Sequence, residues 1–178
     1  MRVLLPMCLL LIAVLEAARA DTSTAEVIED VRFRSITVEH GLSQPTARAL
    51  LHDSRGYVWI GTLDGLNRSD GARIRVFRNL PNQPDSLSDN HISALVEDGE
   101  GQIWVGTAGG GLNRYDPDRE RFEHFVHDPS DPSSIAGNGV TTLGRDALGR
   151  VWVGTSAGGM QRLVPGTRVF AAAAATAQ

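Results

Sequence analysis

The sequence contains no lysine and only one cysteine, and both features restrict the classes of protein to which the chain can belong. All 17 basic residues are arginine, against 21 acidic residues, so the formal net charge is −4. A chain with this balance has no basic patch for the phosphate backbone, and no nucleic-acid partner is expected. The cysteine, Cys8, lies inside an N-terminal apolar run. The chain after that run can therefore form neither disulfides nor thiolate metal sites.

Long apolar runs are also scarce, and the one present is at the N-terminus. Arg2 precedes the run at 3–15, and residues 18–20 (ARA) place small side chains at the two positions that a signal peptidase reads. The run is shorter than the ~20 residues of a membrane-spanning helix, and an uncleaved anchor is the alternative. We expect residues 1–20 to be a signal peptide cleaved before Asp21. Export would then be to the periplasm or another extracytoplasmic compartment, with no membrane contact by the mature segment itself.

The residue patterns of common enzymes are missing as well. No glycine-rich loop opens a helix to cradle phosphate, and no serine lies in a nucleophile elbow. The histidines are scattered, and His124 and His127, three apart on an expected strand, would point to opposite faces. We therefore predict no catalytic, cofactor-binding or metal-binding residues, no cofactor, and no enzyme activity in this chain.

The sequence does contain one motif that is repeated three times. The segments DSRGYVWIGTLDGLNR, DGEGQIWVGTAGGGLNR and DALGRVWVGTSAGGMQR align, and their tryptophans lie 45 and 48 residues apart. Such a period is typical of stacked supersecondary units. The residues of this structural motif are Asp53, Gly56, Trp59, Gly61 and Thr62, then Asp98, Gly101, Trp104, Gly106 and Thr107, and finally Asp146, Gly149, Trp152, Gly154 and Thr155.

Each unit has the pattern of four short strands. In the second copy we expect strands at 91–97, 102–107, 112–116 and 121–127, separated by turns rich in Asp, Gly and Pro. The strand at 102–107 is apolar on both faces, so its sheet must lie between two neighbours. Four antiparallel strands in about 45 residues form a β-propeller blade. We predict an all-β chain of three four-stranded antiparallel blades in an incomplete ring.

Turn geometry accounts for the Asp and Gly positions of the motif. An Asp at the start of a turn accepts backbone amides, and Gly56, Gly101 and Gly149 can adopt positive φ. A row of calcium ligands or catalytic acids is the alternative for the Asp residues. Gly106 is expected to let neighbouring backbone approach beside Trp104. An arginine also recurs at the end of each copy, as Arg68, Arg114 and Arg162. These arginines are either structural links to blade turns or an anion-binding rim.

The phrases GYVWIGTLDGLNR (56–68) and GQIWVGTAGGGLNRYD (101–116) resemble the two-component regulator propeller repeat. HGLSQPTARALLHD (40–53) resembles the way this family leads into a blade, and SLSDNHISALVED and SIAGNGVTTLGRD occupy the same place in the other copies. The resemblance covers roughly residues 31–170. Three positions depart from the shared phrase: Ser69, where the second copy has Tyr115, and the pair Met160 and Gln161, which replaces Leu-Asn.

The resemblance implies the extracytoplasmic sensor of a bacterial signalling protein, most often a hybrid histidine kinase and otherwise a diguanylate cyclase or DNA-binding output. An unknown small molecule or glycan would bind the propeller, and a signalling domain outside this chain would respond. A secreted propeller enzyme, such as a polysaccharide or antibiotic lyase, is the alternative function. The candidate ligand loops are the connectors 79–90 and 128–138, with His91 at the edge of one. The other interpretation is that these are solvated loops.

Three blades are fewer than the about four to eight of a propeller ring. We therefore expect a fragment or truncated reading frame that lacks blades and signalling domains of a longer parent, with a self-assembling partial ring as the alternative. The expected segments are a signal peptide at 1–20, an N-terminal segment with a lone outer strand at 21–38, blades at 39–78, 79–127 and 128–170, and an Ala-rich low-complexity tail at 171–178.

The lone outer strand, expected at residues 30–38, yields a testable prediction. In a closed propeller such a strand completes the last blade, but no blade of that kind follows here, so its amides should exchange rapidly with solvent. We expect native-state hydrogen exchange to place 30–38 among the fastest-exchanging segments of the mature chain. Strong protection of these amides in a monomer would contradict the prediction.

Overall fold

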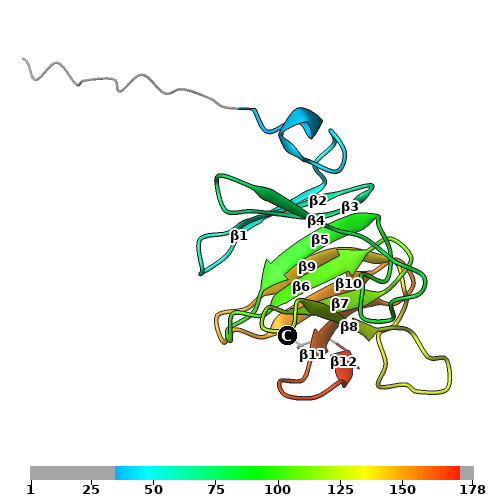
Figure 1. The fold of residues 1–178 in the computed structure, drawn as a ribbon. Coiled ribbons are helices and arrows are strands. Elements are labelled where there is room, and N and C mark those ends of the chain that lie inside the picture. Colours follow the sequence, from blue (N-terminus) through cyan, green and yellow to red (C-terminus); the bar gives the residue numbers. More distant parts are fainter. Residues whose placement is uncertain (1–34, 173–178) are drawn as a thin grey trace, which may run out of the picture. The chain divides into compact units, whose positions relative to one another are not determined.

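The computed structural model describes residues 35–172, which form three four-stranded antiparallel sheets (Figure 1). The prediction of an all-β chain built from four-stranded propeller blades is confirmed. The expected signal peptide at 1–20 and its cleavage site before Asp21 lie outside the described residues, as does the tail from 173 on. The strands are β1 (Ala49–His52), β2 (Val58–Thr62), β3 (Gly65–Ser69) and β4 (Ile74–Phe77), then β5 (Ile92–Glu97), β6 (Ile103–Thr107), β7 (Leu112–Asp116) and β8 (Arg121–Phe125), and finally β9 (Val140–Arg145), β10 (Val151–Thr155), β11 (Gly159–Leu163) and β12 (Phe170–Ala172).

The third sheet extends further than the sequence analysis expects. Its segment was predicted to end at 170, but β12 takes in Ala171 and Ala172, which pair with Arg162 and Gln161 of β11. The pairing explains the difference, because a β-ladder uses backbone groups and an Ala-rich stretch can supply them as well as any other.

The expected lone strand at 30–38 is only partly covered by the described residues. Residues 35–37 form no strand, and Val38 begins a short 3-10 helix, η1 (Val38–His40). The helix ends at Gly41, whose φ of 99° lies in the left-handed region that suits glycine. No helix within residues 35–172 is long and apolar enough to cross a membrane.

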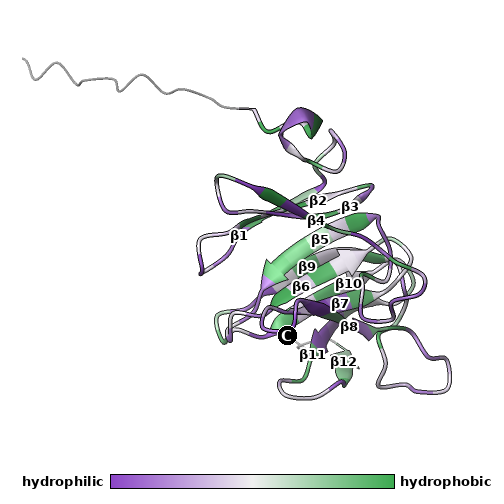
Figure 2. Ribbon diagram, viewed as in Figure 1, coloured by the Kyte–Doolittle hydropathy of each residue, from purple (hydrophilic) through white to green (hydrophobic). Residues whose placement is uncertain are grey.

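The core lies between the sheets rather than inside any one of them. Along β6, Ile103 and Val105 belong to the buried cluster shared with the first sheet, while Trp104 belongs to the cluster shared with the third. This is the two-faced burial that the apolar pattern of 102–107 predicts. Figure 2 shows the matching hydrophobic colouring of the central strands. Each sheet therefore depends on a neighbour to cover its apolar face.

The two intersheet clusters have the same composition. Each combines a tryptophan from one sheet, an aliphatic residue from the connector, and branched aliphatic and aromatic residues from the next sheet. The first consists of Trp59, Leu66, Phe77, Leu87, Ile92, Ile103, Val105, Tyr115 and Phe122, and the second of Trp104, Leu112, Phe125, Ile135, Val140, Val151, Val153, Leu163 and Phe170.

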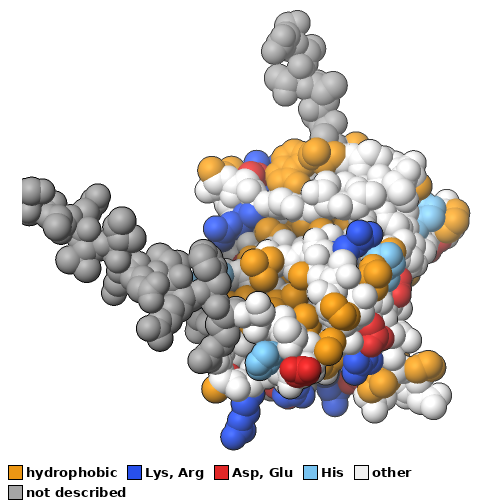
Figure 3. All heavy atoms as spheres, turned by 90° about the horizontal axis from the view of Figure 1, so that it is seen from above, with side chains coloured by type: hydrophobic (Ala, Val, Ile, Leu, Met, Phe, Trp, Pro, Cys, Tyr) orange, Lys and Arg blue, Asp and Glu red, His pale blue; other side chains and the backbone are white. Residues whose placement is uncertain are grey.

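Some large apolar side chains stay at the surface of these sheets, and Figure 3 shows apolar groups exposed on one face. Leu50 of β1 is 70% exposed, and Leu148, in the turn before β10, is 76% exposed. Both belong to the outer two of the three sheets, whereas the middle sheet has a neighbour on each side.

In the first two blades, a glycine in the second strand lets the next sheet approach closely. A Cβ added to Gly61 would lie 2.5 Å from Ile92 Cγ2, and one added to Gly106 would lie 2.5 Å from Val140 Cγ1. The sequence analysis expected neighbouring backbone beside Gly106, and the structure instead places a β-branched side chain of the next sheet there. The glycine is thus a notch that receives Val140.

The notch predicts a specific loss of stability. Gly106→Ala would overpack the contact with Val140, and we expect the free energy of unfolding to fall by about 1–3 kcal/mol. The matched control is Gly144→Ala on β9, where an added Cβ meets nothing within 4 Å. Urea unfolding midpoints measure both effects. Equal midpoints for the two variants would show that the close approach at Gly106 contributes nothing to stability.

Candidate functional site

Each Asp of the repeat motif holds the turn that follows it and the tryptophan of the next strand. Asp53 Oδ1 accepts the backbone N–H groups of Arg55 (3.0 Å) and Tyr57 (2.8 Å), and its Oδ2 accepts the indole N–H of Trp59 at 2.7 Å. We call this arrangement the Asp–Trp clamp. One carboxylate thereby satisfies three donors, two in the turn and one on the strand.

The other two copies have the same clamp. Asp98 Oδ2 lies 2.8 Å from Trp104 Nε1, and Asp146 Oδ2 lies 3.0 Å from Trp152 Nε1. In both, Oδ1 accepts two backbone amides of the turn. The carboxylates are therefore occupied by protein donors. Within residues 35–172 no group of three or more His, Cys, Asp and Glu side chains comes together to hold a metal ion.

The glycines of these turns have positive φ, as the turn geometry requires. The values are 89° at Gly56, 78° at Gly101 and 78° at Gly149. Gly149 has a second role, because its carbonyl accepts the N–H of Gly99 in the preceding turn at 3.0 Å. A Cβ on Gly99 would come within 3.0 Å of the Gly149 Cα. Adjacent turns therefore touch through their backbones.

A side-chain contact joins the first two turns in place of the glycine contact. Both the backbone N–H and the hydroxyl of Ser54 donate to the carboxylate of Glu97, at the end of β5. On the next interface, Arg145 Nη1 donates to the carbonyl of Asp98 at 3.2 Å. We call this edge of the blades, where β1, β5 and β9 end, the Asp-turn end. Its polar groups are largely engaged with one another.

The Thr of the motif closes the opposite edge, the hairpin end. Thr62 Oγ1 donates to the Gly65 carbonyl at 3.0 Å, and Thr107 Oγ1 donates to the Gly111 carbonyl at 2.8 Å. In the third copy Thr155 Oγ1 accepts the N–H of Gly158 at 3.1 Å. These bonds hold the tight connection between the second and third strands of each blade.

The arginine row makes different contacts in each copy. Arg68 crosses to the second sheet, where Nη1 donates to the Tyr115 hydroxyl at 3.1 Å and Nη2 lies 3.6 Å from Glu120 Oε1. Burial raises the pKa of the Tyr115 hydroxyl, and the charge of Arg68 opposes that rise. Arg114 stays in its own sheet and pairs with Glu123 at 2.5 Å. These two arginines are structural links.

Arg162, the third member of the row, differs from the other two. Its Nε is buried and has no hydrogen-bond partner among the described residues. Its Cα partners on the neighbouring strands are Trp152 and Ala171. The copies thus share a backbone frame while their arginines meet different neighbours.

Sequence reasoning missed a second lock, between the segment that leads into a blade and the third strand. Asn67 Oδ1 accepts the N–H of Ser43 at 2.8 Å, and Asn113 Oδ1 accepts the N–H of Ser88 at 3.0 Å. In the third copy Gln161 Oε1 accepts the N–H of Ala136 at 2.7 Å. The sequence contained a sign of this contact, because Leu-Ser and Leu-Asn recur at equivalent positions of the first two copies. Only the folded chain brings the two pairs together.

The connectors named as candidate ligand loops are held by hydrogen bonds, some within a connector and others to histidines in β8 or just after it. In 79–90, the N–H of Asn79 donates to Asn90 Oδ1 at 2.6 Å, and the Ser86 carbonyl lies 2.6 Å from His124 Nε2. In 128–138, the Ile135 carbonyl lies 2.8 Å from His127 Nδ1. The two histidines thus bind the connectors and do not face a common ligand.

Two larger hollows occur on the described residues. One, of about 400 Å³, lies between β4 and β8, where Arg75 and Arg121 are neutralised by Glu120 and Asp85. The other, of about 430 Å³, is at the hairpin end and includes His91; we call it the inner hollow. Its lining residues are Arg48, His91, Ser93, Ala108, Gly139, Val140, Thr141 and Ser156.

The Asp–Trp clamp of the third blade predicts a pH dependence of stability. The indole N–H of Trp152, with the backbone N–H and guanidinium of Arg150, holds the pKa of the Asp146 carboxyl well below its ordinary value. Because the unfolded-state pKa is higher, near about 3.9, the ionised carboxylate stabilises the fold above about pH 4. That contribution is lost as the pH falls toward the lowered folded-state value.

We therefore expect Asp146→Asn to be less stable than the wild type at neutral pH and the difference to shrink in acid. Urea unfolding at a series of values from about pH 7 to about pH 2 measures it. Asp118→Asn, in the exposed turn before β8, is the matched control and should follow the wild type throughout. A difference for Asp146→Asn that is the same at every pH would contradict the role of the ionised clamp.

Comparison with known proteins finds similarity to one family in two segments of this chain. The model of the family described as "Two component regulator propeller" matches residues 41–64 and 86–109. Among curated proteins, histidine kinase P4 of Formosa agariphila is 41% identical over 56 residues, which are 32% of this chain and 4% of that protein.

Solved structures agree with the sequence match. The extracellular domain of BT3049 of B. thetaiotaomicron, described as a hybrid two component system, superimposes with a TM-score of 0.71 and 27% identity over 77% of this chain and 19% of that chain. The extracellular domain of BT4673 from the same organism matches with a TM-score of 0.53 and 28% identity over 66% of this chain and 16% of that one. This chain thus spans less than a fifth of each of these relatives. Two of its three copies of the motif thus match the two-component regulator propeller repeat.

Proposed function

We propose that this chain is part of the ligand-sensing propeller of a two-component histidine kinase of the hybrid kind. The observation that carries the proposal is the superposition of its three blades on the extracellular domain of a hybrid two component system, at a TM-score of 0.71. The proposed ligand is a small molecule or a glycan. The proposed partners are the further blades and signalling domains of a longer parent, in which a diguanylate cyclase is the second candidate for the output.

The proposed location is the periplasm or another extracytoplasmic compartment, reached through cleavage of the N-terminal signal peptide. The solved relatives are extracellular domains, which supports this location. The absence of cysteine after Cys8 is compatible with an oxidising compartment, because no free thiol is then exposed to oxidation there.

The fold supports sensing through a rigid scaffold rather than through a mobile lid. The Asp–Trp clamps, the notch glycines and the intersheet clusters each tie one blade to itself or to the next. A ligand that contacts several blades would therefore favour one arrangement of the blades over another, and a signalling domain coupled to them would respond to the shift in population. The chain's own chemistry in this proposal is binding and orientation, without bond making.

The alternative, a secreted lyase, needs acid or base groups that converge on a substrate. The three motif carboxylates are engaged by turn amides and indoles, and His124 and His127 bind connector carbonyls. The described residues therefore offer no observation in favour of the enzyme, and turnover is the opposing outcome of the test below.

The test is a thermal-shift screen of the full-length chain against a panel of oligosaccharides released from plant and bacterial polysaccharides. A sensor should show a saturable rise in Tm with at least one sugar, because a ligand that binds only the folded state stabilises it. Mass spectrometry should recover that sugar intact. Cleavage of the sugar would overturn the proposal in favour of the lyase, and the absence of a shift with every sugar would overturn glycan sensing by this chain.

A further inference from the structure

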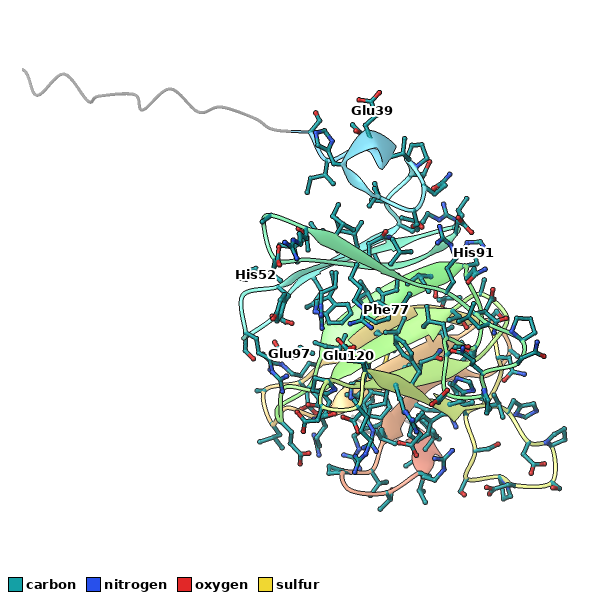
Figure 4. All side chains as sticks on the ribbon, in the orientation of Figure 1. Glu39, His52, Phe77, His91, Glu97 and Glu120 are labelled. Atoms are coloured by element: carbon teal, nitrogen blue, oxygen red, sulfur yellow. The ribbon has the colours of Figure 1, made fainter. Side chains whose placement is uncertain are left out.

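The inner hollow lies at the hairpin end, away from the Asp turns. Figure 4 labels His91 at that edge of the strands and His52 and Glu97 at the other. The hollow draws on all three sheets, since Arg48 precedes β1, Ser93 lies in β5 and Thr141 lies in β9. Its volume of about 430 Å³ is in the range of small-molecule sites, about 300–1,000 Å³.

In the second and third blades a β-bulge directs one side chain toward this hollow. In the second blade Ile92 pairs with Thr107 and Ala94 with Gly106, so Ser93 between them has no partner residue. In the third blade the same irregularity falls between Val140 and Thr142 and leaves out Thr141.

In the first blade Arg48 occupies the equivalent position, directly before β1. Its N–H donates to the Gly61 carbonyl at 2.8 Å, although Gly61 is already the partner of Ala49. Arg48, like Ser93 and Thr141, stands five residues before the Asp of its clamp. Bulges of this kind re-aim a side chain and are frequent beside binding sites.

The hydroxyl of Ser93 is left without a partner in this hollow. It is buried and makes no hydrogen bond within residues 35–172. Thr141, its equivalent in the third blade, instead donates to the Gly154 carbonyl at 3.2 Å. A buried hydroxyl without a partner is costly, and a ligand oxygen in the hollow would remove that cost.

The lining of the hollow contains one charged side chain, that of Arg48, and no Asp or Glu. The nearest acid along the chain, Asp89, is engaged by the backbone N–H groups of His91 (3.1 Å) and Gly109 (3.0 Å). The hollow between β4 and β8 differs, because its arginines are paired with acids. An arginine without a lining acid suits an oxyanion, which guanidinium binds through two parallel hydrogen bonds.

We propose that the inner hollow binds the oxyanion group of an acidic sugar, a carboxylate or a sulfate, with Arg48 pairing with the oxyanion and the Ser93 hydroxyl donating to the same ligand. This inference rests on the proposed sensing function and adds the class of ligand and the residues that bind it. Thr141 and Ser156 lie on the third-blade side of the hollow, where they face the remainder of the sugar ring. The ligand would thus bridge all three blades.

The test titrates the full-length chain with glucuronate, glucose 6-sulfate and glucose by calorimetry. We expect one or both acidic sugars to bind and glucose to bind at least about tenfold more weakly, since a charge-assisted hydrogen bond exceeds a neutral one by about that factor. Arg48→Gln should weaken acidic-sugar binding by about tenfold or more. Ser93→Ala should also weaken it, without lowering Tm, because it removes an unpartnered hydroxyl. Arg73→Gln, in the exposed turn before β4, is the matched control and should change nothing.

The outcomes separate this inference from the sensing proposal. Binding of only one acidic sugar identifies the oxyanion as carboxylate or sulfate, and binding of both means that the hollow accepts either. Binding of glucose or of an oligosaccharide from the panel, with neither acidic sugar bound or with no effect of Arg48→Gln, overturns the inference and leaves sensing in place. The absence of binding by every sugar overturns both.

Discussion

A carboxylate that accepts an indole N–H organises each blade of this protein. The aspartate begins the turn between the first two strands, and in the first two blades the tryptophan it holds is the largest side chain buried between that blade and the next. The clamp therefore acts at two levels. It closes a turn by satisfying its amides, and it fixes the orientation of the ring on which the neighbouring sheet packs. In the first interface that ring lies 5.1 Å from Tyr115, in an edge-to-face arrangement.

The copies differ mainly where one blade meets another. Ser54 reaches Glu97 across the first interface, whereas Gly99 and Gly149 make the corresponding contact across the second. Arg68 finds a tyrosine hydroxyl on the next sheet, but Arg114 pairs within its own. The clamp recurs in every blade and the notch glycine at both interfaces between blades, whereas the polar contacts between blades match each particular neighbour. That difference explains why the motif is regular and its surroundings are not.

The two ends of the blades have different chemistry. At the Asp-turn end, carboxylates, amides and carbonyls satisfy one another, which makes that end a structural one. At the hairpin end, Arg48 and Ser93 line a hollow that has no acid in its lining, and the Ser93 hydroxyl has no hydrogen-bond partner among the described residues. Ligand recognition usually requires polar groups that have no protein partner and are held on a rigid scaffold, because other contacts have already ordered the scaffold.

The sequence by itself determined the period, the blade topology and the two-faced burial of the central strands, because these follow from local turn chemistry and alternation repeated three times. Trp104 and its flanking Ile103 and Val105 could be assigned to opposite faces from the alternation alone. Only the tertiary structure decided what meets across the sheets: Val140 rather than backbone at Gly106, Asn113 at Ser88, and Tyr115 at Arg68. The bulges at Ser93 and Thr141 were also not predicted from the sequence, since a one-residue register shift depends on the pairing between strands.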